Sequence, residues 1–543
     1  MRPSCPRWLR LAELARCGLG WALCLTLPAC GDGDAPVESC ERPGDPGCAA
    51  APTITAEVGF VELAAHEYTI LGQPLSASAA RIFYDFQPAE SDPAAAPLLV
   101  LGAGGPSASS MFLLGWNLGP YAIVEGGPAG TVAPNSHRFT DLGNLLYFDA
   151  RNAGFSYQWL DDPEPSLQRS NAFTVRDYNV WLDGAELLRG LLSFLEDHPA
   201  LEHAPIYFLA ESYGALRATV ALNLLLFHAE YASGGREFRA PDLEAAVEHF
   251  VDTRVGSNGG TPEQLADWFR GQIFIQPFVA GNRQKQMAGA LYEEPGSVLE
   301  QLGAEVGVPF VPCREQSEPC DPYSNAHTFL ADIGRSRYDR RAPSNWLDQN
   351  SDLVSGAATR RAALRRLLGV DAQQLDAAFA GRGQGAYRYG EISYSEGQRR
   401  GDLELAFGPL EPWDAYFVAI NEEALRASLA EDVVALQADS NQAGFFPRLL
   451  ENLTYTSTFI TRAEYDLSVY SPAWIDTFQS YPEVVRAELV TEGTSELLQV
   501  ELRDGSIHSL VSPRYRESGH SVGRDEPEAL HRDVARFLER TRE

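Results

Sequence analysis

The chain has 543 residues, more than one compact domain usually holds, and 45% of them are hydrophobic, which is ample for a core. Its formal net charge of −31 excludes the basic footprint that nucleic-acid binding requires. Such a surplus of acidic residues instead fits a strongly solvated surface outside the cell. We therefore expect one large elaborated domain or two domains, exported, with no nucleic acid as a partner.

The N-terminus predicts a signal peptide of the lipoprotein type. Three arginines lie within the first ten residues, and residues 17–29 form an apolar stretch too short to cross a membrane comfortably. The closing "LTLPAC" resembles the lipobox of bacterial lipoproteins, in which the cysteine, here Cys30, carries the lipid. We expect a signal peptide over 1–29, a flexible tether over 30–53 and a bacterial envelope location (periplasm or outer surface), with the lipid as the only membrane anchor. Simple secretion is the alternative.

Four of the eight cysteines lie in the signal peptide or at the lipidation site. The other four form two close pairs: Cys40 with Cys48, and Cys313 with Cys320. Close pairs in an exported protein suggest two local disulfides. A metal site is the weaker alternative, because neither pair has Cys-x-x-Cys spacing and only His327 lies nearby.

The pattern after the tether predicts an α/β protein. Alternating residues over 54–87 predict antiparallel strands. Short apolar runs then alternate with segments of helical spacing, which together imply a parallel sheet. The apolar runs lie at 98–101, 145–148, 206–210 and 271–279, and the helical segments at 176–199 and 212–232.

The alternation lapses over 281–452, where helical pieces are separated by glycine, proline and polar loops. A long, mainly helical insertion in such a sheet predicts a cap over the site. The α/β pattern resumes over 453–543. We therefore divide the core into a first part, 54–280, and a second part, 453–543.

The stretch "LAESYGAL" places Ser212 at the corner between a predicted strand and a predicted helix. A nucleophile elbow exposes the serine hydroxyl on a turn so tight that its neighbours must be small, which gives G-x-S-x-G. Here Ala210 replaces the first glycine and Gly214 keeps the second. A serine that caps a helix gives the same local pattern, so the motif alone leaves both interpretations open.

A serine nucleophile needs an acid and a histidine later in the chain, in that order. Asp466 follows a predicted strand, and His520 lies in a glycine-flanked loop before the last helix. Other candidates are less suitable: His508 lies in strand-like sequence, His531 within a helix, and Asp476 in helical sequence that we expect to face solvent.

An oxyanion hole needs two backbone N–H groups. Tyr213, after the serine, supplies one, and Gly105 in "GAGGPSASS" is the candidate for the other. A plain turn is the alternative for that loop. A phosphate-binding loop is excluded, because no Gly-Lys-Ser/Thr follows and the spacing is not G-x-G-x-x-G.

Several separated motifs resemble those of serine carboxypeptidases, in family order from about residue 80 to the end. "GGPSASS" with the later "LGP" resembles G-G-P-G-x-S-S…G-P, and "NLLYFDARNAGFSY" resembles the strand that ends in D-x-P-x-G-x-G-F-S-Y. "FLAESYGALRA" resembles G-E-S-Y-G-G, and "SGHSVG" resembles G-H-x-V-P. "AEYDLSVY" is only loosely similar to G-D-x-D-x-x-x-P.

The resemblance implies an α/β-hydrolase fold: a mostly parallel central sheet with helices on both faces and an inserted, mainly helical cap. It implies a catalytic triad of Ser212, Asp466 and His520, with Gly105 and Tyr213 as the oxyanion hole. The substrate would be a peptide or another acyl compound, hydrolysed through an acyl-enzyme without cofactor or metal.

The chain departs from the family at the groups that bind the substrate's C-terminal carboxylate. Ala103 stands for the family's asparagine and Asn117 for one glutamate, so only Glu211 remains. A lone carboxylate repels another unless one is protonated, and the amide that Ala103 lacks costs about 1–3 kcal/mol if nothing replaces it. The candidate substrate-binding set is Glu211, Asn117 and Gly104.

Three functions follow from these residues. The first is a serine carboxypeptidase-like hydrolase that cleaves a C-terminal peptide bond. The second is an esterase or acyltransferase on the same triad, which the missing carboxylate ligands favour. The third is a catalytically silent envelope-binding protein that keeps the fold.

Overall fold

The computed structural model describes residues 54–104, 113–123, 132–151, 153, 156–159, 179–256, 260–278, 280–333, 335–336, 339–343, 365–379, 445–467, 469–493 and 495–542. The signal peptide, the tether with Cys30, the Cys40–Cys48 pair and Gly105 lie outside these residues. Those four predictions therefore stay predictions. Among the helices that the structure describes, none combines the length and the apolar character needed to cross a membrane.

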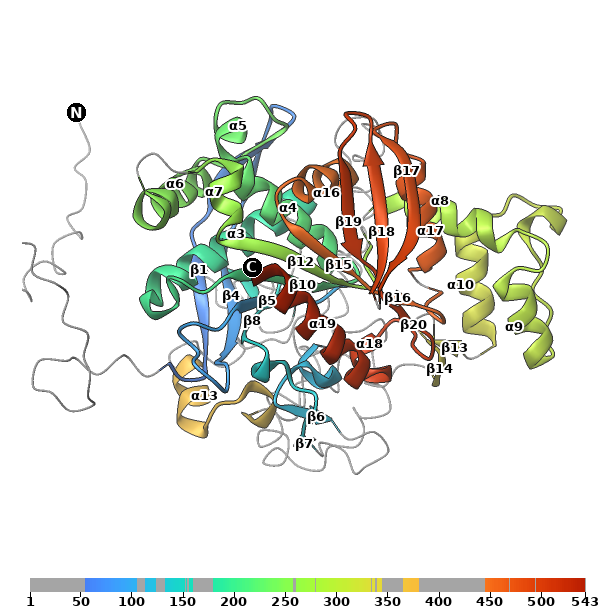
Figure 1. The fold of residues 1–543 in the computed structure, drawn as a ribbon, viewed down its shortest axis with the longest axis horizontal. Helices are drawn as coiled ribbons and strands as arrows, with labels where there is room; N and C mark the ends of the chain where they lie inside the picture. Colours follow the sequence, from blue (N-terminus) through green and yellow to red (C-terminus); the bar gives the residue numbers. More distant parts are fainter. Residues whose placement is uncertain are drawn as a thin grey trace, which may run out of the picture. The chain divides into compact units, whose positions relative to one another are not determined.

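The centre of the structure is an eleven-stranded sheet in the order β1-β4-β8-β5-β10-β12-β15-β19-β18-β17, with β9 paired to β4 (Figure 1). The six strands from β8 to β19 run parallel, and antiparallel strands complete both ends. Their bounds are β1 Glu57–Leu63, β4 Ala79–Gln87, β5 Leu98–Gly102, β8 Asn144–Phe148, β9 Tyr157–Trp159, β10 Ile206–Glu211, β12 Phe269–Ile275, β15 Ser457–Ile460, β17 Val484–Glu492, β18 Ser495–Leu502 and β19 Ile507–Val511. The predicted mostly parallel sheet is confirmed.

The continuous apolar run of β10 is explained by burial on both faces of the sheet. Because side chains alternate along a strand, Phe208 and Ala210 join the apolar cluster on one face, and Tyr207 and Leu209 join the cluster on the other. The second cluster includes Phe537 of the C-terminal helix, whose ring lies 6.2 Å from that of Tyr207. Helices therefore cover both faces, as an α/β-hydrolase sheet requires.

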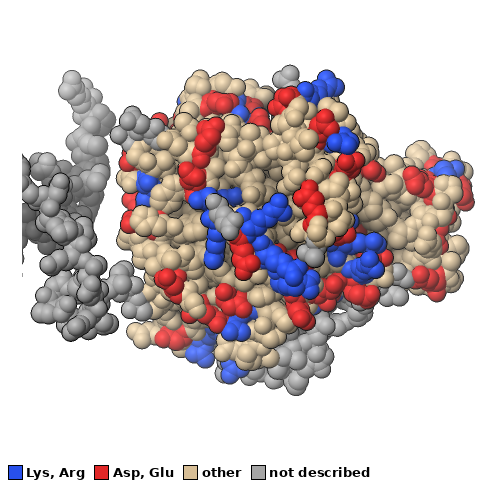
Figure 2. Space-filling view, viewed as in Figure 1, with Lys and Arg blue, Asp and Glu red and all other residues tan. Residues whose placement is uncertain are grey.

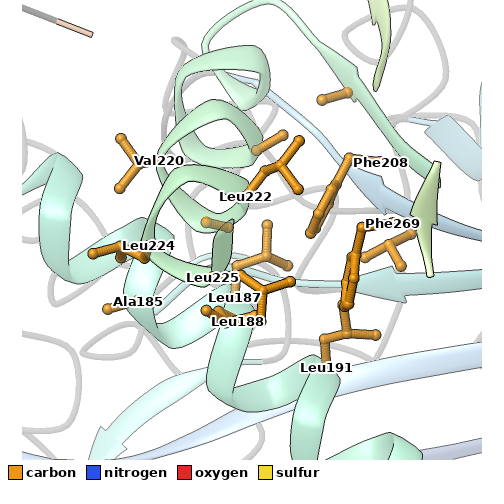
Figure 3. Close-up of a cluster of buried hydrophobic side chains, with 14 of the residues drawn as sticks. Ala185, Leu187, Leu188, Leu191, Phe208, Val220, Leu222, Leu224, Leu225 and Phe269 are labelled. Carbon is orange, nitrogen blue, oxygen red and sulfur yellow. The ribbon is translucent and has the colours of Figure 1, made fainter. Parts of the chain in front are cut away.

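Helices α3 (Val180–Asp197) and α4 (Gly214–Leu226) cover the face on which Phe208 lies. Figure 3 shows their leucines packed toward the rings of Phe208 and Phe269. Asn179 caps α3 by accepting a hydrogen bond from the Leu182 N–H at 2.8 Å. Full burial of each such leucine stabilises the fold by roughly 1.5–3 kcal/mol, so α4 is fixed firmly behind the candidate nucleophile.

Smaller elements complete the fold around this sheet. The other strands are β2 His66–Ile70, β3 Gln73–Ala77, β6 Tyr121–Ile123, β7 Val132–Pro134, β11 Phe238–Arg239, β13 Arg335–Ser336, β14 Asp339–Pro343, β16 Arg462–Ala463 and β20 Arg514–Tyr515. The other α-helices are α5 His228–Ala232, α6 Pro241–Phe250, α7 Pro262–Ala266, α8 Gly281–Tyr292, α9 Val298–Val306, α10 Pro322–Asp332, α13 Ala372–Phe379, α16 Phe445–Leu453, α17 Ser471–Gln479, α18 Val522–Asp525 and α19 Pro527–Arg542. The short helical turns are η1 Leu114–Leu118, η2 Phe139–Asp141, η3 Pro199–Leu201, η4 Val251–Val255 and η5 Cys313–Glu315.

The described pieces of the 281–452 insertion contact three separate places on the core. Helices α8, α9 and α10, which we call the helical module, share an apolar cluster with Leu467 and Ala473 of the core, and α8 packs on α17. Helix α13 packs on β1, where Gln374 Nε2 donates to the Ala56 carbonyl at 2.7 Å. Helix α16 packs on α4 (Figure 1). The cap boundaries stay a prediction, because much of the insertion lies outside the described residues.

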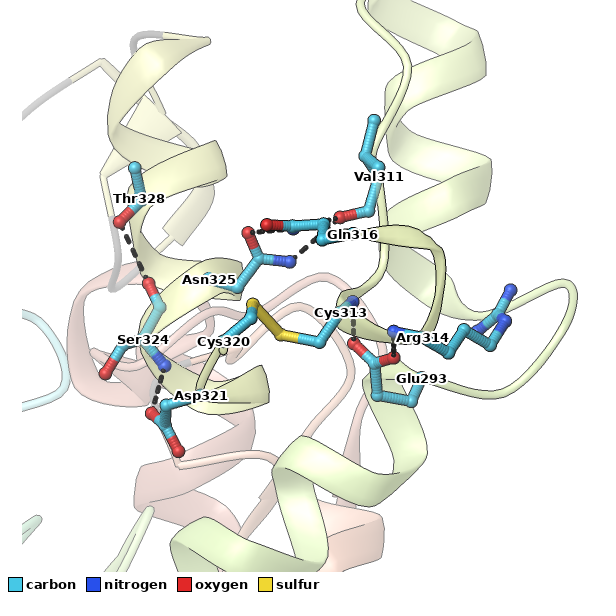
Figure 4. Close-up of a disulfide and its surroundings, with 10 residues drawn as sticks. All are labelled: Glu293, Val311, Cys313, Arg314, Gln316, Cys320, Asp321, Ser324, Asn325 and Thr328. Carbon is cyan, nitrogen blue, oxygen red and sulfur yellow. Dashed lines mark hydrogen bonds between the residues drawn. A yellow bond between two sulfur atoms is a disulfide. The ribbon is translucent and has the colours of Figure 1, made fainter. Parts of the chain in front are cut away.

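The helical module contains the predicted Cys313–Cys320 disulfide, which is present with a Cα–Cα distance of 5.4 Å (Figure 4). It closes the loop between α9 and α10. Two backbone N–H groups of this loop, those of Cys313 and Arg314, donate to the carboxylate of Glu293 at 2.7 and 2.9 Å. The loop is therefore fixed to the end of α8.

Charges of both signs lie together on the face of the molecule in Figure 2, where basic and acidic side chains are interspersed with uncharged surface. Arginines and acidic residues also form ion pairs at the surface, for example Arg532 with Asp533 at 2.9 Å. Each such pair contributes about 0–1 kcal/mol. Mixed surface charge of this kind keeps a protein soluble.

Candidate active site

Ser212 lies at a strained corner between β10 and α4. Its φ of +53° is unusual for a residue other than glycine and costs of order 1–3 kcal/mol. Three backbone hydrogen bonds hold it: its N–H donates to Ile275 O at 3.0 Å, and its carbonyl accepts from Phe278 N–H at 3.0 Å and Ala215 N–H at 3.1 Å. Ser212 does not cap α4, whose N-cap residue is Tyr213, without a side-chain capping bond. The geometry favours the elbow over the capping interpretation.

The glycines around the elbow are required by close contacts. A Cβ on Gly214 would lie 2.4 Å from the Gly102 carbonyl oxygen, and a Cβ on Gly104 would lie 2.6 Å from Ser212 Cβ. Gly104 therefore lies directly against the candidate nucleophile. Because the structure describes Gly104 but not Gly105, the oxyanion hole of Gly105 and Tyr213 stays a prediction.

The structure brings Asp466 and His520 together, 54 residues apart in the chain. His520 Nδ1 lies 2.8 Å from Asp466 Oδ2, and both side chains are buried. Oδ2 also accepts from Gln276 Nε2 at 2.7 Å, and Oδ1 accepts from Val469 N–H at 3.0 Å. Burial raises the pKa of Asp466, but the charge of His520 and these hydrogen bonds outweigh it and hold that pKa below its usual range. The ionised carboxylate only accepts hydrogen bonds, so His520 Nδ1 is the donor.

Gln276 is the residue of this site that the sequence analysis missed. It is fully buried, has a φ of +47°, and follows β12 directly. Besides the bond that its Nε2 donates to Asp466, its side-chain oxygen Oε1 accepts from Thr461 Oγ1 at 3.1 Å and from Ala463 N–H at 2.8 Å. The signal was a polar residue inside the apolar run "IFIQPF", because a buried amide must find partners.

Two hydrogen bonds hold the segment around His520. Asp525 Oδ2 accepts from the Gly519 N–H at 2.8 Å, and Asn117 Nδ2 donates to the Gly523 carbonyl at 3.2 Å. Asn117 has a φ of +69°, and its own carbonyl accepts from Asn135 Nδ2 at 2.6 Å. One N–H of Asn117 is thus committed to the fold, and its predicted contact with substrate stays a prediction.

Glu211 lies beside the nucleophile with an exposure of only 3%. Its Oε1 has no hydrogen-bond partner among the described residues. Burial raises the pKa of Glu211 to about 7, which the nearby charges of His520 and Arg524 oppose and that of Asp466 reinforces. Glu211 therefore keeps its proton to a higher pH than an exposed glutamate does. Ala103 is also buried and offers no polar side chain.

The other histidines and the other acid considered from the sequence take part in different contacts. His508 of β19 lies 3.2 Å from Ser506 Oγ, and His531 of α19 lies 2.7 Å from Asp141 Oδ1. Asp476 lies in α17, as the sequence predicted. In the described ranges, no group of three or more His, Cys, Asp or Glu side chains is arranged to hold a metal ion.

A parallel sheet with helices on both faces, a strained serine at the strand–helix corner, and an acid–histidine pair later in the chain define the α/β-hydrolase class. Within this class, residues 46–225 match the family described as serine carboxypeptidase. The chain is similar to that family over this segment, which contains Ser212 and Gly104. Asp466 and His520 lie beyond it.

Curated proteins with similar sequence carry the same family description. The chain is 27% identical over 135 residues to a serine carboxypeptidase S10 family member of Dictyostelium discoideum, covering 25% of this chain and 29% of that protein. It is 33% identical over 132 residues to a serine carboxypeptidase-like protein of Arabidopsis thaliana, covering 24% and 27%. The chain thus matches less than a third of the length of these relatives.

Among solved structures, the chain is similar to a prohormone-processing carboxypeptidase from Saccharomyces cerevisiae, with 11% identity, a TM-score of 0.48 and coverage of 89% of this chain and 91% of that one. It is also similar to an esterase, with 12% identity, a TM-score of 0.36 and coverage of 89% and 100%.

Proposed function

We propose that this protein is a serine hydrolase of the carboxypeptidase type, which cleaves a C-terminal peptide bond through an acyl-enzyme. The observation that carries the proposal is the buried Asp466–His520 pair. Together with the strained Ser212 elbow, it gives the chain order serine, acid, histidine of an α/β-hydrolase triad. Strain of this kind persists only where surrounding contacts hold it, and it gathers at functional sites. The match of residues 46–225 to serine carboxypeptidases supports the choice of reaction.

In the proposed mechanism, His520 removes the proton of Ser212 as the serine oxygen attacks the substrate carbonyl. The N–H groups of Tyr213 and Gly105 stabilise the oxyanion, and His520 returns the proton to the leaving amine. Asp466 holds the imidazole by its Nδ1–H and stabilises the imidazolium that forms. Water then hydrolyses the acyl-enzyme by the same steps.

Recognition of a substrate carboxylate depends in this proposal on the protonation of Glu211. When neutral, Glu211 shares its proton with the substrate carboxylate; when ionised, it repels that group. The raised pKa of about 7 supports this role, since it keeps the carboxyl neutral in mildly acidic solution. We therefore expect peptide cleavage to weaken as the pH rises through about 7, chiefly through a higher KM.

An esterase or acyltransferase on the same residues is the second candidate. Two observations favour it: Ala103 provides no amide for a carboxylate, and Asn117 uses one N–H for the Gly523 carbonyl. A substrate without a free carboxylate needs neither group. A silent envelope-binding protein is the third candidate, and labelling of Ser212 by an active-site reagent would eliminate it.

Export to the bacterial envelope, with a lipid on Cys30, remains part of the proposal and rests on the "LTLPAC" segment. Replacing Cys30 with alanine should release the protein from the membrane fraction. Retention of Cys30→Ala in that fraction would contradict the anchor.

The test of function compares a blocked dipeptide with its methyl ester, in acidic and in neutral buffer, for wild-type protein and for Ser212→Ala. The carboxypeptidase proposal expects cleavage of the free dipeptide, strongest in acid, and none by the variant. Cleavage of the ester alone would select the second candidate, and equal turnover by Ser212→Ala would refute both enzymatic proposals.

A further inference from the structure

The helical module contacts the loop that carries Asp466, which we call the acid loop (residues 464–467 with 469 and 470). Helix α8 begins a few residues after Phe278, whose N–H bonds to the Ser212 carbonyl, and Gln284 Nε2 ties α8 to the Pro277 carbonyl at 3.1 Å. The helix runs from this neighbourhood to Tyr292, its last residue. One helix thus connects the elbow region with the acid loop.

Tyr292 is fully buried, and its hydroxyl donates to the Leu467 carbonyl at 2.5 Å. Leu467 is the residue directly after Asp466. Its side chain is buried in the apolar cluster of the helical module, together with Tyr292, Leu299 and Leu302. The module therefore holds both the backbone and the side chain of the residue next to the acid.

The core also holds the acid loop. Ser471 Oγ donates to the Ala463 carbonyl at 3.3 Å across the base of the loop, and Gln276 donates to the Asp466 carboxylate. The Tyr470 ring packs on the Tyr292 ring, with centroids 5.4 Å apart. The direction of the carboxylate is thus set jointly by the core and by the module.

We propose that Tyr292 is a positioning residue that acts through Asp466, and that the module α8–α10 is a brace for the acid of the triad. This inference rests on the proposed function. Without the hydroxyl, the buried Leu467 carbonyl loses its donor and the acid loop relaxes, which turns the carboxylate away from His520 Nδ1. Small displacements of a catalytic group slow a reaction steeply, because the reacting geometry is populated less often.

The residue after Tyr292 is held by the disulfide loop of the module. Glu293 follows Tyr292 and accepts two N–H groups from the loop that the Cys313–Cys320 disulfide closes (Figure 4). The end of α8 is therefore fixed at consecutive residues, to the disulfide loop through Glu293 and to the acid loop through Tyr292. The module keeps its shape while it holds Leu467.

Tyr292→Phe tests the inference, because it removes one oxygen atom and keeps the ring. The matched control is Tyr231→Phe, which removes another buried hydroxyl, one that donates to Asn223 Oδ1 of α4 at 2.7 Å. The readout is the rate constant of Ser212 labelling by a fluorophosphonate probe, well below the melting temperature of each variant. We expect Tyr292→Phe to label roughly 5- to 20-fold more slowly than wild type. The control Tyr231→Phe should label within about twofold of wild type. Both variants should lower the melting temperature, because each loses a buried hydrogen bond.

A second comparison separates positioning from a general loss of stability. In an Asp466→Asn background, Tyr292→Phe should slow the residual labelling less than about twofold, because the group through which it acts is already impaired. The same slowing in both backgrounds would overturn the inference, and so would equal labelling rates of Tyr292→Phe and wild type. Wild-type protein that does not label at Ser212 would overturn the proposed function and the inference together.

Discussion

Glu211→Gln isolates the energetic effect of burying a carboxyl group beside the nucleophile. Glu211 is 3% exposed, one of its oxygens has no partner in the described part of the chain, and its pKa is raised to about 7 from an ordinary 4.5. Glutamine has nearly the same shape and resembles the protonated acid. The substitution therefore removes the ionisation and leaves the packing largely in place.

The size and direction of the effect follow from the two pKa values of Glu211. One pKa unit corresponds to about 1.4 kcal/mol, so ionising Glu211 in the folded protein costs about 3 kcal/mol more than in the unfolded chain. Because the folded pKa is the higher one, the folded protein binds this proton more tightly. The resulting stability is complete below about pH 4.5 and is lost as the pH rises through about 7.

The assay is denaturant unfolding of wild type and Glu211→Gln between about pH 4 and pH 8, with Glu483→Gln at an exposed glutamate as the control. We expect the stability of Glu211→Gln relative to wild type to increase by about 3 kcal/mol between about pH 4.5 and pH 7 and then to level off. The control should show no such trend. A difference that is constant with pH, or that decreases as the pH rises, would refute our account of Glu211.

Three further predictions concern the elbow, the acid and the disulfide. Gly214→Ala should destabilise the fold by roughly 1–3 kcal/mol, since its Cβ would lie 2.4 Å from the Gly102 carbonyl; unchanged thermal unfolding would contradict the tight elbow. Asp466→Asn should slow probe labelling by roughly 10³- to 10⁴-fold with little change in circular dichroism, and near wild-type labelling would remove Asp466 from the triad. Reducing Cys313–Cys320 should cost about 2 kcal/mol of stability, measured by thermal unfolding against a double serine variant that does not respond to reductant.

The parallel sheet and the elbow were predictable from the sequence because their signals are local. The apolar run 206–210 and the helical spacing of 212–232 are neighbours in the chain, and the structure confirms a strand and a helix there, β10 and α4. The pairing of Asp466 with His520 followed from chain order and from the resemblance, and the structure brings the two together. The capping interpretation of Ser212 was the local alternative, and the observed backbone does not support it.

The supporting contacts were not predictable, because they join segments far apart in the chain. Gln276 and Asp466 are 190 residues apart, and Tyr292 and Leu467 are 175 apart. Nothing in the sequence near Tyr292 distinguishes it from another apolar position of a helix. An amphipathic pattern shows that one face of a helix is buried but not what covers it. For the same reason the sequence did not predict that the described pieces of the insertion contact the core at three places.

The central claim is that Ser212, activated by His520 and Asp466, forms an acyl-enzyme. Peptide mapping by mass spectrometry after reaction with a fluorophosphonate tests it most directly. We predict a single adduct on Ser212, none in Ser212→Ala, and a strongly slowed reaction in His520→Ala. Absence of an adduct on the wild-type protein, or an adduct at another residue that persists in Ser212→Ala, would contradict it.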